Sequence, residues 1–293
     1  MERPSLSTLR AFIDWTPFFR SWGLAGPFPR ILEDEVVGEE ATSLFRDAEA
    51  LLDAWEQAED APECRAAHGI FRAGRTAPET VTVFASDGST VLGDFEFLRQ
   101  QTEQRTGVQR SLADFIAPAD GAATDAIGCF AVAVHGIDAF ARAHEQNGDD
   151  YQSILVKAVG DRLAEAMAEW LHQYVRTTTW GYAAEESLTN QELIKEAYRG
   201  IRPAPGYPAC PDHLDKDLIW TLLDAEKSIG AALTESKAIL PAAAVAGYYF
   251  AHPEARYLGV GLIQNDQLND WAARRGLPIE RAQRWLASNL LES

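Results

Sequence analysis

An arginine followed by a run of prolines is the part of this sequence whose residue types and spacing best suit ligand binding. The segment reads Arg202-Pro203-Ala204-Pro205-Gly206-Tyr207-Pro208-Ala209-Cys210-Pro211. Four prolines in ten residues exclude a helix and a central strand, because proline lacks an N–H donor and fixes φ. The segment is therefore predicted to be a stiff, polyproline-like ribbon whose backbone carbonyls are left free as acceptors. We refer to residues 202–211 as the ribbon.

The side chains of the ribbon suit a small ligand that carries a carboxylate and a flat ring. Arg202 stands at its start, Gly206 permits close backbone approach, and Tyr207 follows. A second interpretation remains open, because proline-rich loops mostly connect other elements. From residue chemistry alone, the connecting role is the more frequent one.

The segment before the ribbon is predicted to be a helix with signals at both ends. A capping box occupies residues 189–192, and Gly200 is placed as the C′ glycine. Such a helix would fix the start of the ribbon at Arg202. Glu196 lies one turn before the predicted end, where the helix dipole disfavours an anion. Glu196 therefore either pairs with a neighbouring base or faces a cationic ligand.

Three more polar positions have two interpretations each. Asp14 heads the aromatic segment 14–22, where it either caps the following turn or faces a ligand. His213 follows the ribbon and by spacing alone is a surface histidine near a helix start. The third position belongs to a stripe on the long helix predicted over 149–176. The stripe consists of Lys157, Asp161, Glu165 and Glu169, and four-residue spacing of this kind is by default a solvated face.

The elements that must position these residues alternate irregularly between helices and strands. Further helices are predicted at 1–13, 39–54, 94–105, 217–229, from an N-cap at Asn265 to 275, and at 278–286. Hairpins are predicted at 81–92 and 244–263, and the apolar run 127–134 is predicted to be a strand buried on both faces. Residues 57–67 are polar and read as a loop. This order indicates an α+β protein.

The composition argues against several classes of function. The chain has 293 residues and a formal net charge of −18, which argues against nucleic acid as a partner. Its three cysteines are far apart and match no zinc spacing, so they are predicted to be reduced thiols of a cytoplasmic protein. The apolar runs are too short to cross a bilayer, so no membrane is expected as a partner. No nucleotide loop, nucleophile elbow or zinc-protease motif is present, and no metal site is predicted.

The ribbon closely resembles the S-adenosylmethionine-binding segment of the activation domain of cobalamin-dependent methionine synthase. Colinear segments along essentially the whole chain resemble the same family, namely 14–19, 29–34, 98–103, 149–151, 156–158, 161–166, 180–183, 233–236 and 284–290. Residues 57–90 match the family poorly. The resemblance implies a single activation domain over 1–293, with a twisted, mainly antiparallel sheet and flanking helices.

The resemblance also implies a function. In this family the domain binds S-adenosylmethionine and supports the reductive methylation of cob(II)alamin to methylcobalamin, which reactivates the methyltransferase. The partners implied are a cobalamin-binding domain or subunit, which holds the vitamin B12 cofactor, and a flavodoxin-like electron donor. Methyl transfer draws off the reduced cofactor as it forms and so traps an unfavourable reduction.

Residue by residue, the resemblance places Arg202 on the ligand carboxylate and Asp14 on its ammonium group. Tyr257 and Leu258 would lie against the adenosine. The remaining implied contacts are one wall from Ala204, Gly206 and Tyr207, acidic liners Glu165 and Glu196, and Tyr207 and His213 toward the corrin. None of these residues need be a catalytic acid or base, because the protein's part is positioning.

The chain also departs from the large enzyme. It has no Asp-x-His-x-x-Gly cobalamin anchor, no zinc ligands for homocysteine and no folate-binding barrel. It is therefore not expected to make methionine alone, and it is either a fragment or a separate reactivation subunit. The alternative function is a module that senses S-adenosylmethionine or caps a corrinoid protein without methyl transfer. A structural subunit with a decayed site is a third reading, against which the set of Asp14, Arg202 and Tyr257 argues.

Overall fold

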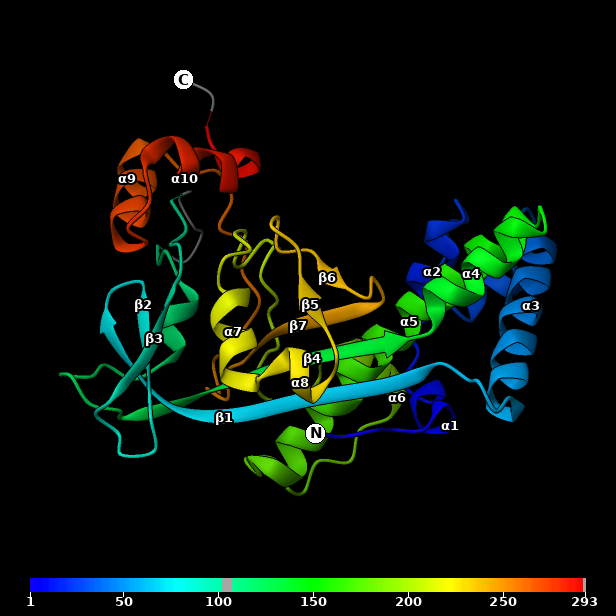
Figure 1. The fold of residues 1–293 in the computed structure, drawn as a ribbon, viewed down its shortest axis with the longest axis horizontal. Coiled ribbons are helices and arrows are strands. Elements are labelled where there is room, and N and C mark those ends of the chain that lie inside the picture. The colour runs from blue at the N-terminus through cyan, green and yellow to red at the C-terminus, as the bar shows by residue number, and fades with distance from the viewer. Residues whose placement is uncertain (102–106, 292–293) are drawn as a thin grey trace.

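A five-stranded antiparallel sheet with strand order β3-β2-β1-β4-β7 forms the centre of the fold (Figure 1). The structure is a computed structural model that describes residues 1–101 and 107–291. The strands of the sheet are β1 (Glu63–Ala77), β2 (Thr80–Phe84), β3 (Val91–Glu96), β4 (Asp125–His135) and β7 (Ala244–Tyr249). A small second sheet pairs β5 (Ala232–Leu233) with β6 (Ile239–Leu240). The predicted α+β class, with a mainly antiparallel sheet and flanking helices, is confirmed.

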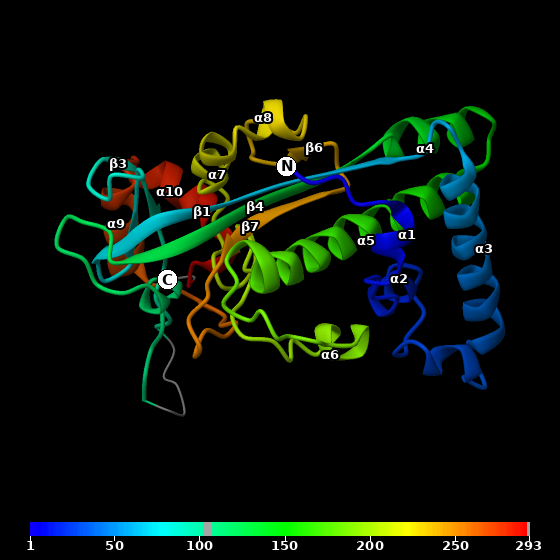
Figure 2. The ribbon, with the colours of Figure 1, turned by 90° about the horizontal axis from the view of Figure 1, so that it is seen from below.

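Helices lie against both faces of the sheet. The long helix α5 (Asp150–Tyr174) covers one face, and α7 (Lys216–Leu223) and α8 (Ala225–Ser228) cover the other (Figure 2). The other helices are α1 (Leu6–Arg10), α2 (Thr16–Ser21), α3 (Gly38–Gln57), α4 (Ile137–Gln146), α6 (Asn190–Ile194), α9 (Asn265–Arg274) and α10 (Ile279–Trp285). None of the helices in the described part of the chain combines the length and apolar character that crossing a bilayer requires.

Strand β4 explains why two cores form. Its residues 127–134 are all buried, as the unbroken apolar run predicts, and successive side chains point to opposite faces. Phe130, Val132 and Val134 join the core beneath α5. Cys129, Ala131 and Ala133 join the core beneath α7. A strand covered on both faces has no polar alternation, and the sequence shows none.

The loop predicted at 57–67 is confirmed for 58–62, but strand β1 replaces it from Glu63 onward. The strand runs for 15 residues and pairs with β4 from Glu63 to Ala73 and with β2 beyond Arg72. Small residues such as Ala66 and Ala67 are buried on its two faces, while its arginines lie at partly exposed positions. Alanine and charged residues have low strand propensity, so pairing on both sides overrides local preference here.

The ribbon occupies the free side of β7, where a second hairpin was predicted. Ile201 pairs with Phe250, and the Tyr248 N–H donates to the Pro203 carbonyl at 2.9 Å. Residues 257–263 therefore do not return along β7. They run outside the ribbon, where the Val260 N–H donates to the Pro208 carbonyl at 2.8 Å. The predicted hairpin at 244–263 is wrong beyond β7. The hairpin predicted at 81–92 is confirmed as β2 and β3.

Four predicted helices have different bounds. Residues 94–96 belong to β3 and 97–101 to no helix, so the helix predicted at 94–105 is wrong where the chain is described; its last four residues lie outside that part. The helix predicted at 217–229 breaks at Asp224, whose φ of 47° is left-handed. The helix before the ribbon ends at Ile194, well before Gly200. Helix α9 begins at Asn265, with Gln264 in the cap position.

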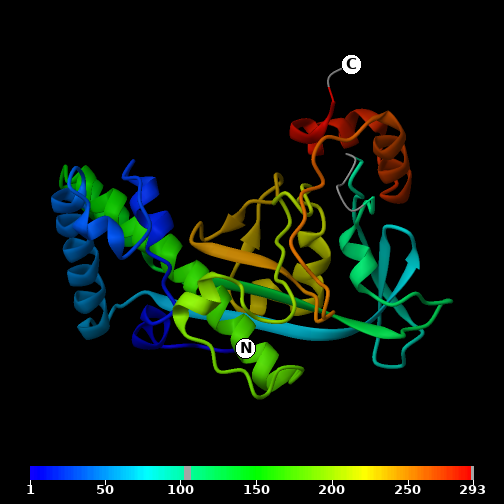
Figure 3. The ribbon, with the colours of Figure 1, turned by 180° about the vertical axis from the view of Figure 1, so that it is seen from behind.

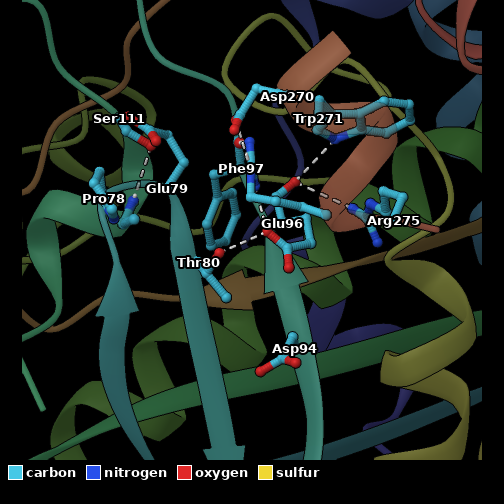
Figure 4. Close-up of polar contacts among 12 residues, drawn as sticks. Pro78, Glu79, Thr80, Asp94, Glu96, Phe97, Ser111, Asp270, Trp271 and Arg275 are labelled. Atoms are coloured by element: carbon cyan, nitrogen blue, oxygen red, sulfur yellow. Dashed lines mark hydrogen bonds and ion pairs between the residues drawn. The ribbon is translucent and has the colours of Figure 1, made fainter. Parts of the chain in front are cut away.

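The C-terminal helices α9 and α10 lie at the β2–β3 end of the sheet, opposite α2, α3 and α4 (Figure 3). Figure 4 shows how α9 is attached to β3: the Trp271 Nε1–H and an Arg275 Nη2–H both donate to the Glu96 carbonyl, at 3.3 and 3.1 Å. Thr80 donates to the Glu96 carboxylate at 2.8 Å, and Arg274 pairs with it from α9. This attachment fixes α9 beside the end of the ribbon.

Candidate functional site

Two adjoining cavities lie between α5 and the ribbon. The first has a volume of about 510 Å³ and is walled by the ribbon and by residues 257–259. The second has a volume of about 380 Å³ and reaches α2, α6 and the segment between α1 and α2. Both are lined by Glu165, Glu196 and Arg202, so the two cavities meet at these charged side chains.

Eight of the ten predicted site residues line these cavities. Ala204, Tyr207, Tyr257 and Leu258 line the first, Asp14 lines the second, and Glu165, Glu196 and Arg202 line both. The structure therefore brings together residues from the N-terminus, α5, the ribbon and the segment after β7. Gly206 and His213 are not among the described lining residues of either cavity.

Arg202 is the charged residue at the junction. Its Nη2 donates to the Glu169 Oε2 at 2.6 Å, and its backbone N–H donates to the Tyr257 hydroxyl at 3.1 Å. Burial alone would lower the pKa of Arg202, but Glu169, Tyr198 and Tyr257 together outweigh burial and hold the pKa above its ordinary value. Arg202 is thus a permanent cation whose backbone is held by Tyr257 and whose guanidinium is held by Glu169.

Glu169 corrects the prediction of a solvated stripe on α5. Its side chain is 8% exposed, whereas Lys157 at the start of the stripe is 51% exposed. The ribbon covers the last turn of the stripe, so burial changes along one helix face although the sequence spacing does not. Glu169 is a functional candidate that periodicity alone did not find.

Asp14 caps the following turn and also lines the second cavity. Its Oδ1 accepts a hydrogen bond from the Thr16 N–H at 2.9 Å, which satisfies a free donor in the first turn of α2. The same side chain lines the second cavity together with Arg162, Glu165 and Glu169. Capping therefore fixes Asp14 at the wall of the site.

Glu196 occupies an unusual position at the end of α6. Its φ is 55°, in the left-handed region that glycine usually fills at C′. Ala197 N–H donates to the Glu192 carbonyl at 3.0 Å and Glu196 N–H to that of Leu193 at 2.8 Å, which is a Schellman motif. Partial desolvation raises the pKa of Glu196; Arg202 opposes the shift and Glu169 adds to it. Glu196 lines both cavities, and its contact with a cationic ligand stays a prediction.

Replacing Glu196 by glycine is expected to stabilise the fold by about 0.5–1 kcal/mol, because glycine has no steric penalty at positive φ. Urea unfolding measures this. Lys195→Gly is the matched control, since Lys195 has φ of −84° and glycine there should destabilise. Lower stability of Glu196→Gly than of the wild type would contradict the strain argument.

The ribbon is a tight hairpin-like loop and not the open chain predicted. The carbonyls of Pro203, Ala204, Tyr207, Pro208 and Cys210 all accept backbone N–H bonds, so most of its acceptors are used within the fold. Gly206 has φ of 99°, and a Cβ there would lie 2.1 Å from the His213 Cε1. Position 206 therefore requires glycine because the His213 ring packs where a side chain would lie, which agrees with the close backbone approach predicted for Gly206.

His213 lies behind the ribbon and not at the cavities. Its Nδ1 is 3.1 Å from the Lys216 ammonium, and burial together with this cation lowers its pKa. Tyr207 has the opposite character, because 56% of it is exposed beside the first cavity. Tyr207 is thus free to meet a partner, while His213 supports the loop that carries it.

The comparison with known proteins decides the family. The family model for the activation domain of vitamin B12 dependent methionine synthase matches residues 5–276. This chain belongs to that family. A crystal structure of the MetH reactivation domain bound to AdoHcy is also similar, with a TM-score of 0.94 and 49% identity. The match covers 100% of this chain and 90% of that one.

A buried acidic pair anchors the end of the ribbon in this activation domain. Asp212 and Asp215 both approach Arg275 of α9, at 3.4 and 2.5 Å, and Tyr248 of β7 donates to Asp215 at 2.6 Å. Two carboxylates share one guanidinium in an interior site. Burial raises the pKa of Asp212 to about 7, Arg275 opposes the shift, and Asp215 adds to it.

The raised pKa makes stability depend on pH. A carboxyl whose folded pKa exceeds its unfolded value stabilises the fold fully below pH ~4, and this contribution is lost as pH rises toward 7. Asp212→Asn cannot titrate, so its unfolding free energy relative to the wild type should increase with pH, by at most roughly 1.4 kcal/mol per pH unit. Urea unfolding between pH 5 and 8 measures the difference. A difference that stays constant with pH would contradict it.

Metal chemistry is not indicated by the site. Across residues 1–101 and 107–291, no three side chains of the types that ligate metals gather closely enough to hold an ion. The three cysteines are buried, and burial raises the pKa of Cys210 well above its ordinary value.

Proposed function

We propose that this chain binds S-adenosylmethionine in the two adjoining cavities and supports reductive methylation of cob(II)alamin to methylcobalamin, which reactivates methionine synthase. The observation that carries the proposal is the junction at Arg202, where a fixed cation, three carboxylates and an aromatic wall meet. The relative bound to AdoHcy supports it, because AdoHcy is what remains when S-adenosylmethionine has given up its methyl group.

The two cavities suit the two ends of this ligand. Arg202 would bind the carboxylate, since a guanidinium pairs with planar oxyanions, and Asp14 in the second cavity would take the ammonium. Tyr257 and Leu258 in the first cavity would lie against the adenosine. Glu165 and Glu196 lie where the cavities meet and would favour the cationic sulfonium over a neutral thioether.

The part of this chain in the reaction is positioning. Cobalamin, held by a partner domain or subunit, would supply the cobalt that accepts the methyl group after an electron from a flavodoxin-like donor. The methyl leaves sulfur with its bonding electron pair left behind, so the sulfonium becomes a neutral thioether and no side chain of this protein needs to move a proton. The chain would hold the methyl carbon at the mouth of the cavity, beside the exposed Tyr207. Fixing the orientation of the reacting group in this way raises the rate of transfer.

Calorimetry with the purified chain tests the binding half. S-adenosylmethionine and S-adenosylhomocysteine should both bind, with the cationic ligand favoured at low salt because of the acidic liners. Absence of binding at high micromolar ligand would overturn the proposal.

Reconstitution tests the methylation half against the alternative, a module that senses S-adenosylmethionine or caps a corrinoid without transfer. The purified chain, a partner loaded with cob(II)alamin, an electron donor and methyl-labelled S-adenosylmethionine are combined. Label in methylcobalamin supports the proposed function. Tight ligand binding without label transfer supports the alternative.

A further inference from the structure

Behind Arg202 lies a line of alternating charges that reaches into the interior. Arg202 contacts Glu169 at 2.6 Å, Glu169 approaches Arg176 at 3.9 Å, and Arg176 pairs with Glu186 at 2.6 Å. Exposure falls along this line, from 20% for the Arg202 side chain to 0% for that of Arg176. The two anions and two cations balance, which is what burial requires.

The inner end of this line is held rigidly. Arg176 lies in the π-helical turn Val175–Thr179 that follows α5, where Trp180 N–H donates to the Val175 carbonyl at 2.9 Å. Its guanidinium lies 4.0 Å from the centre of the Tyr198 ring, and Glu186 binds it through both Nε and Nη2. Such turns are frequent at functional sites, because the widened turn redirects a side chain. Glu169 therefore faces a fixed cation.

The outer end is held by one contact. Nη2 of Arg202 donates to Glu169, whereas the buried Nε has no hydrogen-bond partner among the described residues. The buried Oε1 of Glu169 and Nη1 of Arg176 likewise have none within the described chain. Glu169 therefore engages Arg202 through one nitrogen alone, and that single contact sets the direction of the guanidinium.

Arg99 is an example of a fully hydrogen-bonded arginine in the same protein. Its Nε, Nη1 and Nη2 donate to Glu79, to Asp114 and to the Pro78 and Gln109 carbonyls, at 2.6–2.9 Å. Every nitrogen of that guanidinium is used. Arg202 is directed by one carboxylate and otherwise left open, which suits a residue that must receive a ligand.

We propose that Glu169 is a positioning residue: through its single contact with Arg202, backed by Arg176 and Glu186, it directs the guanidinium at the ligand carboxylate. Glu169 thereby sets the preference of the site for ligands that carry a carboxylate. The inference rests on the proposed function, since it assigns a role within the same cavities. Without the Glu169 charge, no anion would lie between the guanidinium groups of Arg202 and Arg176. Their repulsion would turn the Arg202 side chain away, because Glu169 is its one anchor among the described residues.

The test compares two ligands in Glu169→Gln, which keeps the shape of the side chain. S-adenosylmethionine carries the carboxylate; decarboxylated S-adenosylmethionine lacks only that group and keeps the ammonium, sulfonium and adenosine. Affinity for the first should fall about tenfold or more, while affinity for the second changes less than about twofold, because the lost contact is one charge-assisted pair. Asp161→Asn is the matched control, since it removes an exposed charge from the same stripe of α5 and should change neither affinity.

The possible results distinguish a positioning role of Glu169 from direct contact with the ligand and from failure of the proposed function. Unchanged or tighter binding of S-adenosylmethionine by Glu169→Gln overturns the positioning role, and an equal loss for both ligands overturns it in favour of direct contact with the ammonium. A wild-type protein that binds neither ligand overturns the proposed function itself. If Glu169→Gln does not fold, Glu169→Asp keeps the charge beside Arg176 but shortens the reach, and the same loss confined to the carboxylate-bearing ligand is expected.

Discussion

Arg202→Ala is expected to weaken binding of S-adenosylmethionine by about 2–4 kcal/mol, which is roughly 30- to 1000-fold in Kd. The variant removes the cation proposed for the ligand carboxylate. It also leaves the Glu169 carboxylate, 8% exposed, without its nearest partner. Calorimetry gives the affinity, and urea unfolding gives the part of the loss that comes from stability.

Arg202→Lys separates charge from shape. Lysine keeps the charge but not the planar fork, so it should restore stability more fully than affinity. If Arg202→Ala binds S-adenosylmethionine as well as the wild type does, the assignment of the ligand carboxylate to this residue is wrong. Equal affinity of the lysine and arginine proteins would show that charge alone suffices.

Gly247→Ala is expected to have the second large effect, because β7 and the ribbon touch at this residue. A Cβ there would lie 2.3 Å from the Pro203 carbonyl oxygen and 3.1 Å from the Ala204 Cα. The Phe130 Cε1 would also lie 2.9 Å away, and because the nearest obstacle is backbone, relief requires the ribbon to move off the strand. We expect a loss of roughly 1–3 kcal/mol in unfolding free energy, as for overpacking, together with weaker ligand binding.

Gly259→Ala is the matched control for that change. Gly259 lines the first cavity, but an added Cβ would meet only the Pro208 Cβ, at 3.9 Å. Both variants add one methyl group near the ribbon, and only one of them displaces it. Similar stability losses in the two proteins, measured by urea unfolding, would show that the contact between β7 and the ribbon is not specific.

The predictable part of the fold is the part whose signals are local. The run 127–134 gave β4, and the apolar periodicity of 149–176 gave α5, because length and pattern agreed at both places. Strand β1 escaped prediction, since its alanines, arginines and glutamate carry a weak strand signal and its order comes from two neighbouring strands. The hairpin predicted after β7 is wrong for a related reason, because Ile201 and Pro203 of an earlier segment already pair with the edge of β7.

The residues that line the site could be predicted from the sequence, but the buried charge pairs behind them could not. Asp14, Arg202 and Tyr257 converge as the family resemblance implied, although their ligand contacts stay predictions. Glu169 shared the spacing of its exposed neighbours on α5, and only the ribbon, over 30 positions away, buries it. One signal was available: Arg176 follows seven residues later, two turns along the same face. A π-helical turn at 175–179 has no comparable sequence signature.

The proline ribbon also has a consequence for solubility. β7 is the last strand of the sheet, and an uncovered last strand presents a row of N–H and C=O groups on which another chain can pair and aggregate. The ribbon accepts the Tyr248 N–H through Pro203 and cannot offer proline N–H groups to a further strand. The sheet is thus closed by the loop that lines the ligand cavities. Variants that loosen this loop should self-associate as well as lose ligand, and light scattering would detect the difference from variants that lose ligand alone.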